Sequence, residues 1–168
     1  MRALRRVDPL ARRSLAYRGW ARFSGIRAMG WVSRHVAWKL DPVLMRLTGG
    51  RLRATFLLPS ALLETIGART GLPRRNVVVY FHDGDDVVLM PSRLGDPRDP
   101  GWFHNAVAHP EVVLGGERFR AEVVNDPHEV ARLWPLADRV FPAYAAYRRR
   151  AAMAGRTIPL LRLVSKRA

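Results

Sequence analysis

Short apolar runs dominate the chain after residue 56, and this pattern is typical of β-strands. Asp83-Gly84 and Gly115-Gly116 lie between neighbouring runs and are typical of tight hairpin turns. Valine, a residue enriched in strands, fills several of the runs. The pattern predicts strands over residues 56–66, 73–81, 86–91, 111–114, 118–124 and 158–164.

Three helices are predicted between these strands. Asp126 followed by Pro127 is typical of an N-cap with proline at the first helical position, and it predicts a helix from Pro127 to Leu136. Further helices are expected within residues 98–109 and over residues 143–152. Short strands joined by hairpins favour a small antiparallel split β-barrel of the α+β, mainly β class, because the βαβ alternation of a doubly wound sheet is absent.

The first 50 residues follow a helical pattern instead. Asp8-Pro9 and Asp41-Pro42 each predict a helix start, and Gly49-Gly50 predicts the end of the second helix. Three tryptophans fall within about 20° of one another on a helical wheel: Trp20, Trp31 and Trp38. We therefore expect a helical extension over residues 1–53 and a barrel domain over residues 54–168.

Charge divides the chain at the same place. The formal net charge is +15, and residues 1–53 hold thirteen basic and two acidic residues, so the extension carries +11. Such an excess favours anionic partners. Tryptophan mixed with arginine suits an anionic membrane surface, although the same residues could simply pack on the barrel or face water. Nucleic acid is not an expected partner, because no recognition motif accompanies the charge.

Several classes of chemistry are excluded or disfavoured. The chain has no cysteine, which rules out disulfides and thiol catalysis and makes a cytoplasmic location natural. No apolar run reaches the ~18–20 residues of a membrane-spanning helix, and no secretory signal is apparent. The histidines lack metal-ligand spacing, and no hydrolase or nucleotide-binding motif occurs. If the protein is an enzyme, its reactive atoms are expected to belong to a cofactor.

Two segments could bind ligands. The glycine-bounded turn from Gly67 to Gly71 carries Arg69, and its backbone N–H groups could form an anion-binding nest; a solvated basic hairpin is the alternative. Tyr144 and Tyr147 are three residues apart on one side of a predicted helix, where they could wall an aromatic site or pack as ordinary half-buried rings.

With these residues in view, the chain resembles the deazaflavin-dependent nitroreductase family of actinobacteria, split β-barrel proteins that use reduced coenzyme F420. The likeness covers about residues 55–164. The likeness rests on short motifs that keep the family's order and near-gapless spacing. They are residues 67–74, Asp83-Gly84, Ser92-Arg93, residues 99–105, His109-Pro110, Trp134-Pro135, Phe141-Pro142 with Tyr144 and Tyr147, and residues 156–159.

The resemblance implies a role for each part of the site. The coenzyme's phosphate and oligoglutamate tail would be held by Arg69, Thr70 and Arg74, with Arg75 adding charge. The ring would be lined by Asn76, Val77, Val78, Val79, Tyr80, Met90, Pro91, Ser92 and Arg93, and the site closed by Gly101, Trp102, Phe103, His104 and Asn105. Phe141, Tyr144 and Tyr147 would line the acceptor site. Ser92 and Tyr144 would be catalytic, donating hydrogen bonds to the anion formed by hydride transfer.

The expected function is therefore hydride transfer from F420H2 to a hydrophobic, electron-poor acceptor of the quinone or nitro type. The protein would be cytoplasmic, peripheral on the inner face of the cell membrane, and a homodimer is compatible with this reading. No metal is expected. Some residues depart from the family pattern: Ala68, Val77, Met90, Leu94 and Phe141. Of these, Ala68, Met90 and Leu94 leave open a non-catalytic barrel that binds a lipid, fatty acid or other flat ligand. A split barrel that binds FMN is a lesser alternative.

Overall fold

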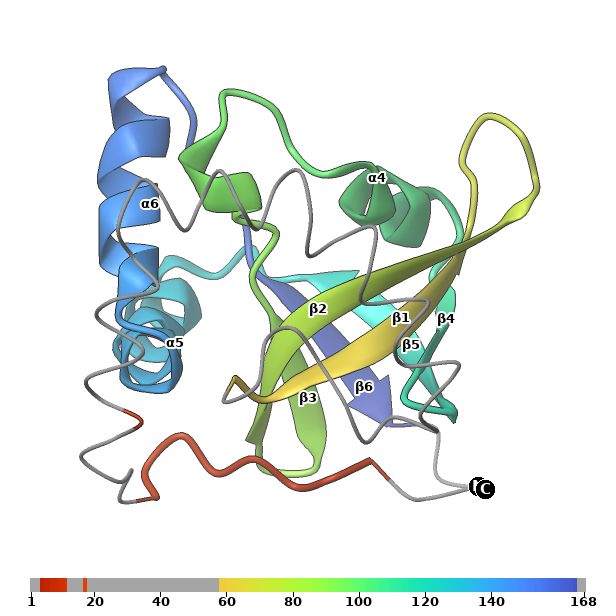
Figure 1. Cartoon of the computed structure of the whole chain (residues 1–168), viewed down its shortest axis with the longest axis horizontal. Coiled ribbons are helices and arrows are strands. Elements are labelled where there is room, and N and C mark those ends of the chain that lie inside the picture. The colour runs from red at the N-terminus through yellow and green to blue at the C-terminus, as the bar shows by residue number, and fades with distance from the viewer. Residues whose placement is uncertain (1–3, 12–16, 18–57, 166–168) are drawn as a thin grey trace.

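The computed structural model describes residues 4–11, Tyr17 and residues 58–165 (Figure 1). The tryptophan stripe and the helix predicted after Asp41-Pro42 lie outside these residues. At Asp8-Pro9 the described residues form a turn, in which the Asp8 carboxylate accepts from the Leu10 amide at 2.8 Å.

Six antiparallel strands form a closed barrel in the order β1-β2-β3-β6-β5-β4. Their bounds are β1 Ser60–Ile66, β2 Pro73–Asp83, β3 Asp86–Leu89, β4 Glu111–Leu114, β5 Glu117–Val123 and β6 Leu161–Ser165. Both predicted hairpins are present, since Asp83 pairs with Asp86 and Leu114 pairs with Glu117. The predicted small antiparallel barrel is confirmed. Four bounds were wrong by two or more residues: β1 begins at Ser60, although the prediction included residues 58 and 59, β2 ends at Asp83 rather than Phe81, β3 ends at Leu89 rather than Pro91, and β6 begins at Leu161 rather than Ile158.

Within residues 58–165, three α-helices and a short 3-10 turn accompany the barrel: η2 Arg93–Gly95, α4 Gly101–Ala108, α5 Pro127–Val140 and α6 Ala143–Met153. Asp126 caps α5 as predicted, accepting from the His128 amide at 3.1 Å. The predicted end at Leu136 was wrong. The helix continues because Leu133, Ala137 and Val140 recur at helical spacing and are buried, which outweighs the cost of an exposed proline at position 135.

The strand register explains the core. Residues paired across antiparallel strands point to the same face of the sheet, and the pair Leu63 and Leu114 and the pair Leu89 and Leu161 are fully buried. These leucines therefore fill the barrel interior. The next residues along the strands, such as Val88 and its partner Arg162, point to the opposite face of the sheet, where Val88 is also fully buried.

A charged cluster joins the β2–β3 hairpin, β6 and α5. The guanidinium of Arg162 lies 2.7 Å from Asp83 and 3.0 Å from Asp86, and it also bonds Glu129 of α5. Arg132 donates two hydrogen bonds to Asp83, at 2.9 and 2.6 Å. The hydrogen bond from Arg132 is the largest cause that lowers the pKa of Asp83 to about 2. Asp86 is thus one of the carboxylates that bind Arg162.

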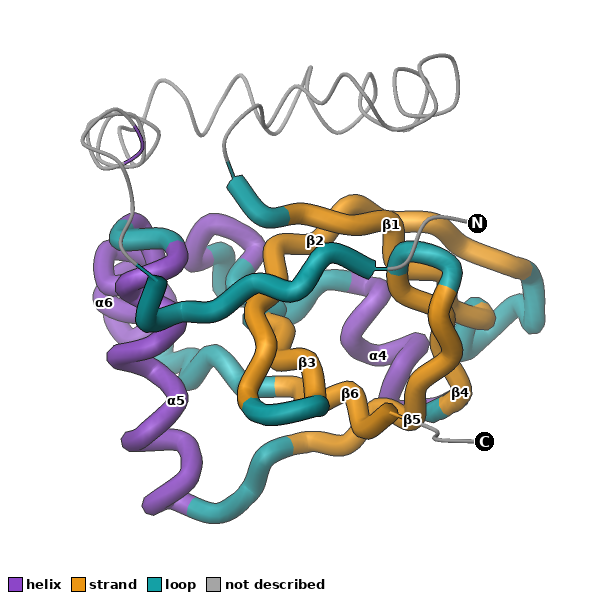
Figure 2. The backbone as a smooth tube through the Cα atoms, turned by 90° about the horizontal axis from the view of Figure 1, so that it is seen from below, coloured by secondary structure: helices purple, strands orange, loops and turns teal. Residues whose placement is uncertain are grey.

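Residues 4–11 run across one end of the barrel towards α5 and α6 (Figures 1 and 2). Val7 is buried, and its amide donates to Nδ1 of His82 at 3.1 Å while its carbonyl accepts from the His82 amide at 2.8 Å. Burial is the largest cause that lowers the pKa of His82, which keeps the imidazole neutral and able to accept. The hydroxyl of Tyr17 donates to the Val140 carbonyl. Parts of the predicted extension therefore pack on the barrel.

Candidate functional site

The glycine-bounded turn joins β1 to β2 and projects beyond the barrel (Figure 1). Its amides are largely occupied within the molecule. The Gly67 carbonyl accepts from the amides of Thr70 and Gly71 at 3.2 and 2.8 Å, and the Ala68 amide donates to Oδ1 of Asn105 at 3.0 Å. These bonds already occupy the amides of Ala68, Thr70 and Gly71, so few N–H groups of the turn are left for the predicted backbone nest. Anion binding by this turn falls to its arginine side chains.

The arginines around the turn differ in their partners. Arg75 lies opposite Glu64 in the strand register and is paired with it at 3.2 Å. Arg69 is exposed and makes no ion pair within the described part of the chain. Among the described residues, Arg74, also exposed, reaches only the Thr70 hydroxyl, at 3.5 Å. Arg69 and Arg74 are thus the arginines of this turn whose guanidinium groups have no acidic partner in the described ranges and can bind an anionic ligand.

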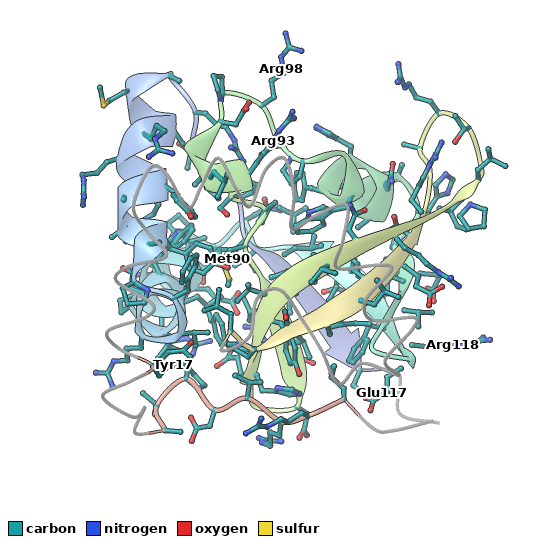
Figure 3. The ribbon with its side chains drawn as sticks, viewed as in Figure 1. Tyr17, Met90, Arg93, Arg98, Glu117 and Arg118 are labelled. Atoms are coloured by element: carbon teal, nitrogen blue, oxygen red, sulfur yellow. The ribbon has the colours of Figure 1, made fainter. Side chains whose placement is uncertain are left out.

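The residues predicted to line the coenzyme ring differ in how far their side chains are buried. Val78 and Tyr80 are buried, and the Tyr80 hydroxyl donates to the Arg5 carbonyl at 2.8 Å. Their side chains therefore belong to the core. Asn76, Val77 and Val79 are half-buried and leave side-chain surface for a ligand. Met90 and Pro91 are buried, whereas Ser92 is half-buried and Arg93 is exposed; Figure 3 shows Arg93 on the side of the barrel that carries η2 and α4.

Helix α4 lies between the turn and the loop that contains η2 (Figure 1). Phe103 anchors it in the core, Trp102 is half-buried, and Gly101 and His104 are exposed. The amide group of Asn105 joins two neighbours: Oδ1 accepts from Ala68, and Nδ2 donates to the Thr65 hydroxyl at 3.3 Å. Asn105, predicted to contact a cofactor, is thus used to hold the turn that carries Arg69.

Phe141, Tyr144 and Tyr147 come together with Trp134 in one aromatic cluster. The Tyr144 ring lies 5.1 Å from Phe141, 6.2 Å from Tyr147 and 6.3 Å from Trp134, all edge-on. Such edge-to-face packing stabilises aromatic groups. The structure therefore brings together the three residues predicted to line an acceptor site.

Both tyrosines of this cluster are buried, with 3% exposure at Tyr144 and 5% at Tyr147. Within the described residues neither hydroxyl makes a hydrogen bond, nor does the hydroxyl of Ser92. Burial is the largest cause that raises the pKa of Tyr144 far above its ordinary value and that of Tyr147 to about 12. Both phenols are therefore neutral at physiological pH and can donate a hydrogen bond.

Sequence reasoning missed two arginines that organise the loop after β3. Arg156 donates to the carbonyls of Pro91, Ser92 and Asp96 and to the Asp99 carboxylate. Arg150 donates to the Leu94 carbonyl at 2.6 Å. Arg156 belongs to a segment that carries the family resemblance, but contacts across about 60 residues have no periodicity by which a sequence would reveal them.

The fold and these side chains define a class: a barrel that binds an anionic cofactor and leaves the reactive chemistry to it. Exposed, unpaired guanidinium groups fit phosphate and carboxylate groups, and neutral hydroxyls fit a developing oxyanion. Among the residues that the structure describes, no group of three or more acidic or histidine side chains could hold a metal ion. No helix in the described ranges is long and apolar enough to cross a membrane.

Comparison with known proteins agrees with this class. The model of the F420H(2)-dependent quinone reductase family matches residues 39–164, and the chain belongs to this family. An F420H(2)-dependent quinone reductase of Mycobacterium tuberculosis (strain H37Rv) is 40% identical over 119 residues, which cover 64% of this chain and 79% of the relative. The predicted resemblance, the oxidoreductase class and coenzyme F420 as the cofactor are confirmed.

Two solved structures share the fold. An F420-H2 dependent reductase (FDR-A) superposes with a TM-score of 0.54 at 27% identity, over 62% of this chain and 93% of the other. A structure described as a domain-swapped dimer gives a TM-score of 0.56 at 25% identity, over 81% of this chain and 98% of the other. For the present chain, a homodimer stays a prediction.

Proposed function

We propose that the protein reduces a hydrophobic quinone with hydride from F420H2, and that Arg69 and Arg74 hold the coenzyme's anionic tail. The observation that carries the proposal is the pair of exposed guanidinium groups without an acidic partner in the described part of the chain. They lie on the turn to which the family resemblance assigns the tail. The family to which the chain belongs supports the reaction.

The protein's own side chains would bind the coenzyme, orient the quinone and stabilise the negative charge that forms on it. When bound, the reduced deazaflavin supplies the hydride. Val77 and Val79 share one face of β2 and offer half-buried surface beside its ring, and Asn105 keeps the Arg69 turn in place. The neutral phenols of Tyr144 and Tyr147 and the hydroxyl of Ser92 would donate hydrogen bonds to the quinone oxygen as it gains negative charge. Such donors lower the barrier when they are fixed in advance in a dry site.

Titration of the full chain with coenzyme F420, followed by its fluorescence, tests the proposal. We expect a dissociation constant in the micromolar range, which corresponds to about 8 kcal/mol, and oxidation of F420H2 when a quinone is added. No fluorescence change up to ~1 mM coenzyme, which corresponds to about 4 kcal/mol, would contradict it. Mass spectrometry of a gently purified sample then distinguishes the alternatives, because a retained lipid indicates a binding module and flavin absorbance indicates FMN.

We also propose that the basic segment over residues 1–53 binds an anionic membrane surface on the cytoplasmic side. Its charge of +11 supports this, since each basic residue near such a surface contributes about 1 kcal/mol. Because residues 4–11 and Tyr17 pack on the barrel, the test should leave them intact. Replacing Arg18, Arg22, Arg27 and Arg34 by glutamine should lower pelleting with phosphatidylserine vesicles at least about 10-fold and leave coenzyme affinity unchanged. Unchanged pelleting would contradict the membrane role.

A further inference from the structure

The loop between β3 and α4 has an uncommon backbone. Arg93 and Leu94 have φ angles of 45° and 59°, in the left-handed region that non-glycine residues rarely adopt. Two such residues in succession cost free energy, and they persist only where the surrounding structure holds them. The loop carries Ser92, so what holds it also sets the position of the Ser92 hydroxyl.

The guanidinium of Arg156 fixes this loop by hydrogen bonds. It donates to the carbonyls of Pro91, Ser92 and Asp96, and the Ser92 and Asp96 contacts measure 3.2 and 2.6 Å. It also bonds the Asp99 carboxylate, through Nε at 3.0 Å and through Nη2. The Arg156 side chain is only 8% exposed. One buried group thus fixes the loop on both sides of Arg93 and Leu94.

Helix α6 also contacts the loop directly. Arg150 of α6 donates to the Leu94 carbonyl at 2.6 Å. Gly95 approaches α6 so closely that a Cβ atom there would lie 2.6 Å from the Tyr147 carbonyl oxygen. The loop that carries Ser92 is therefore fastened to the helix that carries Tyr144 and Tyr147.

We propose that Arg156 is a positioning residue for hydride transfer: it fixes the Ser92 hydroxyl relative to the phenols of α6. This inference rests on the proposed function. Arg156 itself is buried and saturated with partners, so it acts through the loop rather than on the ligand. A displacement of about 1 Å at such a site can cost about 100-fold in rate, whereas tail binding at Arg69 and Arg74 does not depend on the loop.

Only an arginine satisfies this site. Its planar fork offers five N–H donors, and here they reach three carbonyls and one carboxylate at once. A lysine could still pair with Asp99 but could not reach all three carbonyls. Arg156→Lys should therefore keep the fold and lose the geometry of the loop.

The experiment compares Arg156→Lys and Arg156→Met with Arg162→Lys, a matched control. Arg162 is another mostly buried arginine among carboxylates, with 15% side-chain exposure, in the cluster around Asp83. Three quantities are measured: hydrogen exchange at the amides of Ser92, Gly95 and Asp96, coenzyme affinity by fluorescence, and the single-turnover rate of F420H2 oxidation by a soluble benzoquinone. These amides bond within the loop, to Met90, Ser92 and Arg93, and so report on its closure.

We expect Arg156→Lys to speed exchange at these amides at least 10-fold and to slow hydride transfer about 100-fold. The coenzyme dissociation constant should rise much less, by at most about 10-fold, because Arg69 and Arg74 still hold the tail while the loop lines only part of the ring. Hydride transfer should be slower still in Arg156→Met, so the lysine variant should retain part of the transfer rate. Arg162→Lys should lower thermal stability without changing exchange in the loop or the transfer rate.

Two results would overturn the proposal: a folded Arg156→Lys variant with a transfer rate within 3-fold of the wild type, or an equal loss of coenzyme affinity and rate. If neither Arg156 variant folds, Asp99→Asn weakens the bonds by which Arg156 fixes the loop and should slow hydride transfer about 10-fold. An unchanged transfer rate in Asp99→Asn would overturn the proposal. If the wild type fails to oxidise F420H2, the proposed function fails. Hydrogen exchange in the loop then tests separately whether Arg156 fixes the loop. Unchanged exchange in Arg156→Lys would show that it does not.

Discussion

Replacing both Arg69 and Arg74 by alanine is expected to raise the dissociation constant for coenzyme F420 about 100-fold. A hydrogen bond to a charged group contributes roughly 1.5–3 kcal/mol, and each 1.4 kcal/mol corresponds to about a tenfold change in affinity. Each single variant should therefore weaken binding about 10-fold. The thermal stability of the variants should stay the same, since both side chains are exposed and, within residues 4–11, 17 and 58–165, Arg74 makes only the 3.5 Å contact to Thr70.

Arg118→Ala is the control for the loss of charge. Arg118 is exposed on β5, away from the side that carries Arg93 and Arg98 (Figure 3), and its removal changes the net charge by the same amount as either single variant. Coenzyme affinity should stay within about 2-fold. Salt provides a second check, because contacts between exposed charges are screened by added salt: affinity should fall with salt in the wild type and much less in the double variant. A double variant that binds within 3-fold of the wild type would contradict the assignment of the tail.

Arg75 marks the limit of what the sequence could indicate about this turn. It stands beside Arg74 and has the same charge, so the sequence offers no reason to treat the two differently. The strand register does: Arg75 lies opposite Glu64 and pairs with it, whereas Arg74 lies opposite Thr65. Whether a guanidinium is available therefore depends on the pairing of β1 with β2.

Local signals were sufficient for most of the barrel. The valine-rich runs, the Asp83-Gly84 turn and the Asp126 cap act within a few residues, and the structure contains the strands, hairpin and helix start that they predicted. The end of α5 was missed because tertiary burial of Ala137 and Val140 overrides the local signal of Pro135.

The contacts that shape the site act over long distances in the sequence. Asn105 bonds Ala68 across 37 residues, and Arg156 bonds Pro91 across 65. Such side chain to backbone contacts have neither a period nor a spacing that identifies them. The family resemblance located the site residues, and the structure separates those that offer surface to a ligand from those, such as Tyr80 and Asn105, whose polar groups are already bonded within the protein.

Tyr144→Phe is expected to have opposite effects on activity and stability. The buried hydroxyl makes no hydrogen bond within the described residues, and an unsatisfied buried polar group costs roughly 1–3 kcal/mol. Removing it should therefore leave the free energy of unfolding unchanged or raise it by about 1 kcal/mol. If the hydroxyl donates to the quinone oxygen during hydride transfer, its loss should slow the single-turnover rate about 10-fold to 100-fold. Thermal unfolding and stopped-flow oxidation of F420H2 measure the two effects.

Tyr17→Phe is the matched control, because the Tyr17 hydroxyl is also buried but donates to the Val140 carbonyl. Its loss should lower stability by about 1 kcal/mol and leave the transfer rate unchanged. The pH dependence adds a further test. Burial raises the pKa of Tyr144 far above its ordinary value and that of Tyr147 to about 12, so both phenols keep their protons as pH rises through the ordinary tyrosine value of about 10. The wild-type rate should therefore show no loss centred at about pH 10, where an ordinary tyrosine gives up its proton. A loss of rate centred there, or a Tyr144→Phe variant as fast as the wild type, would contradict the role of Tyr144 as the donor.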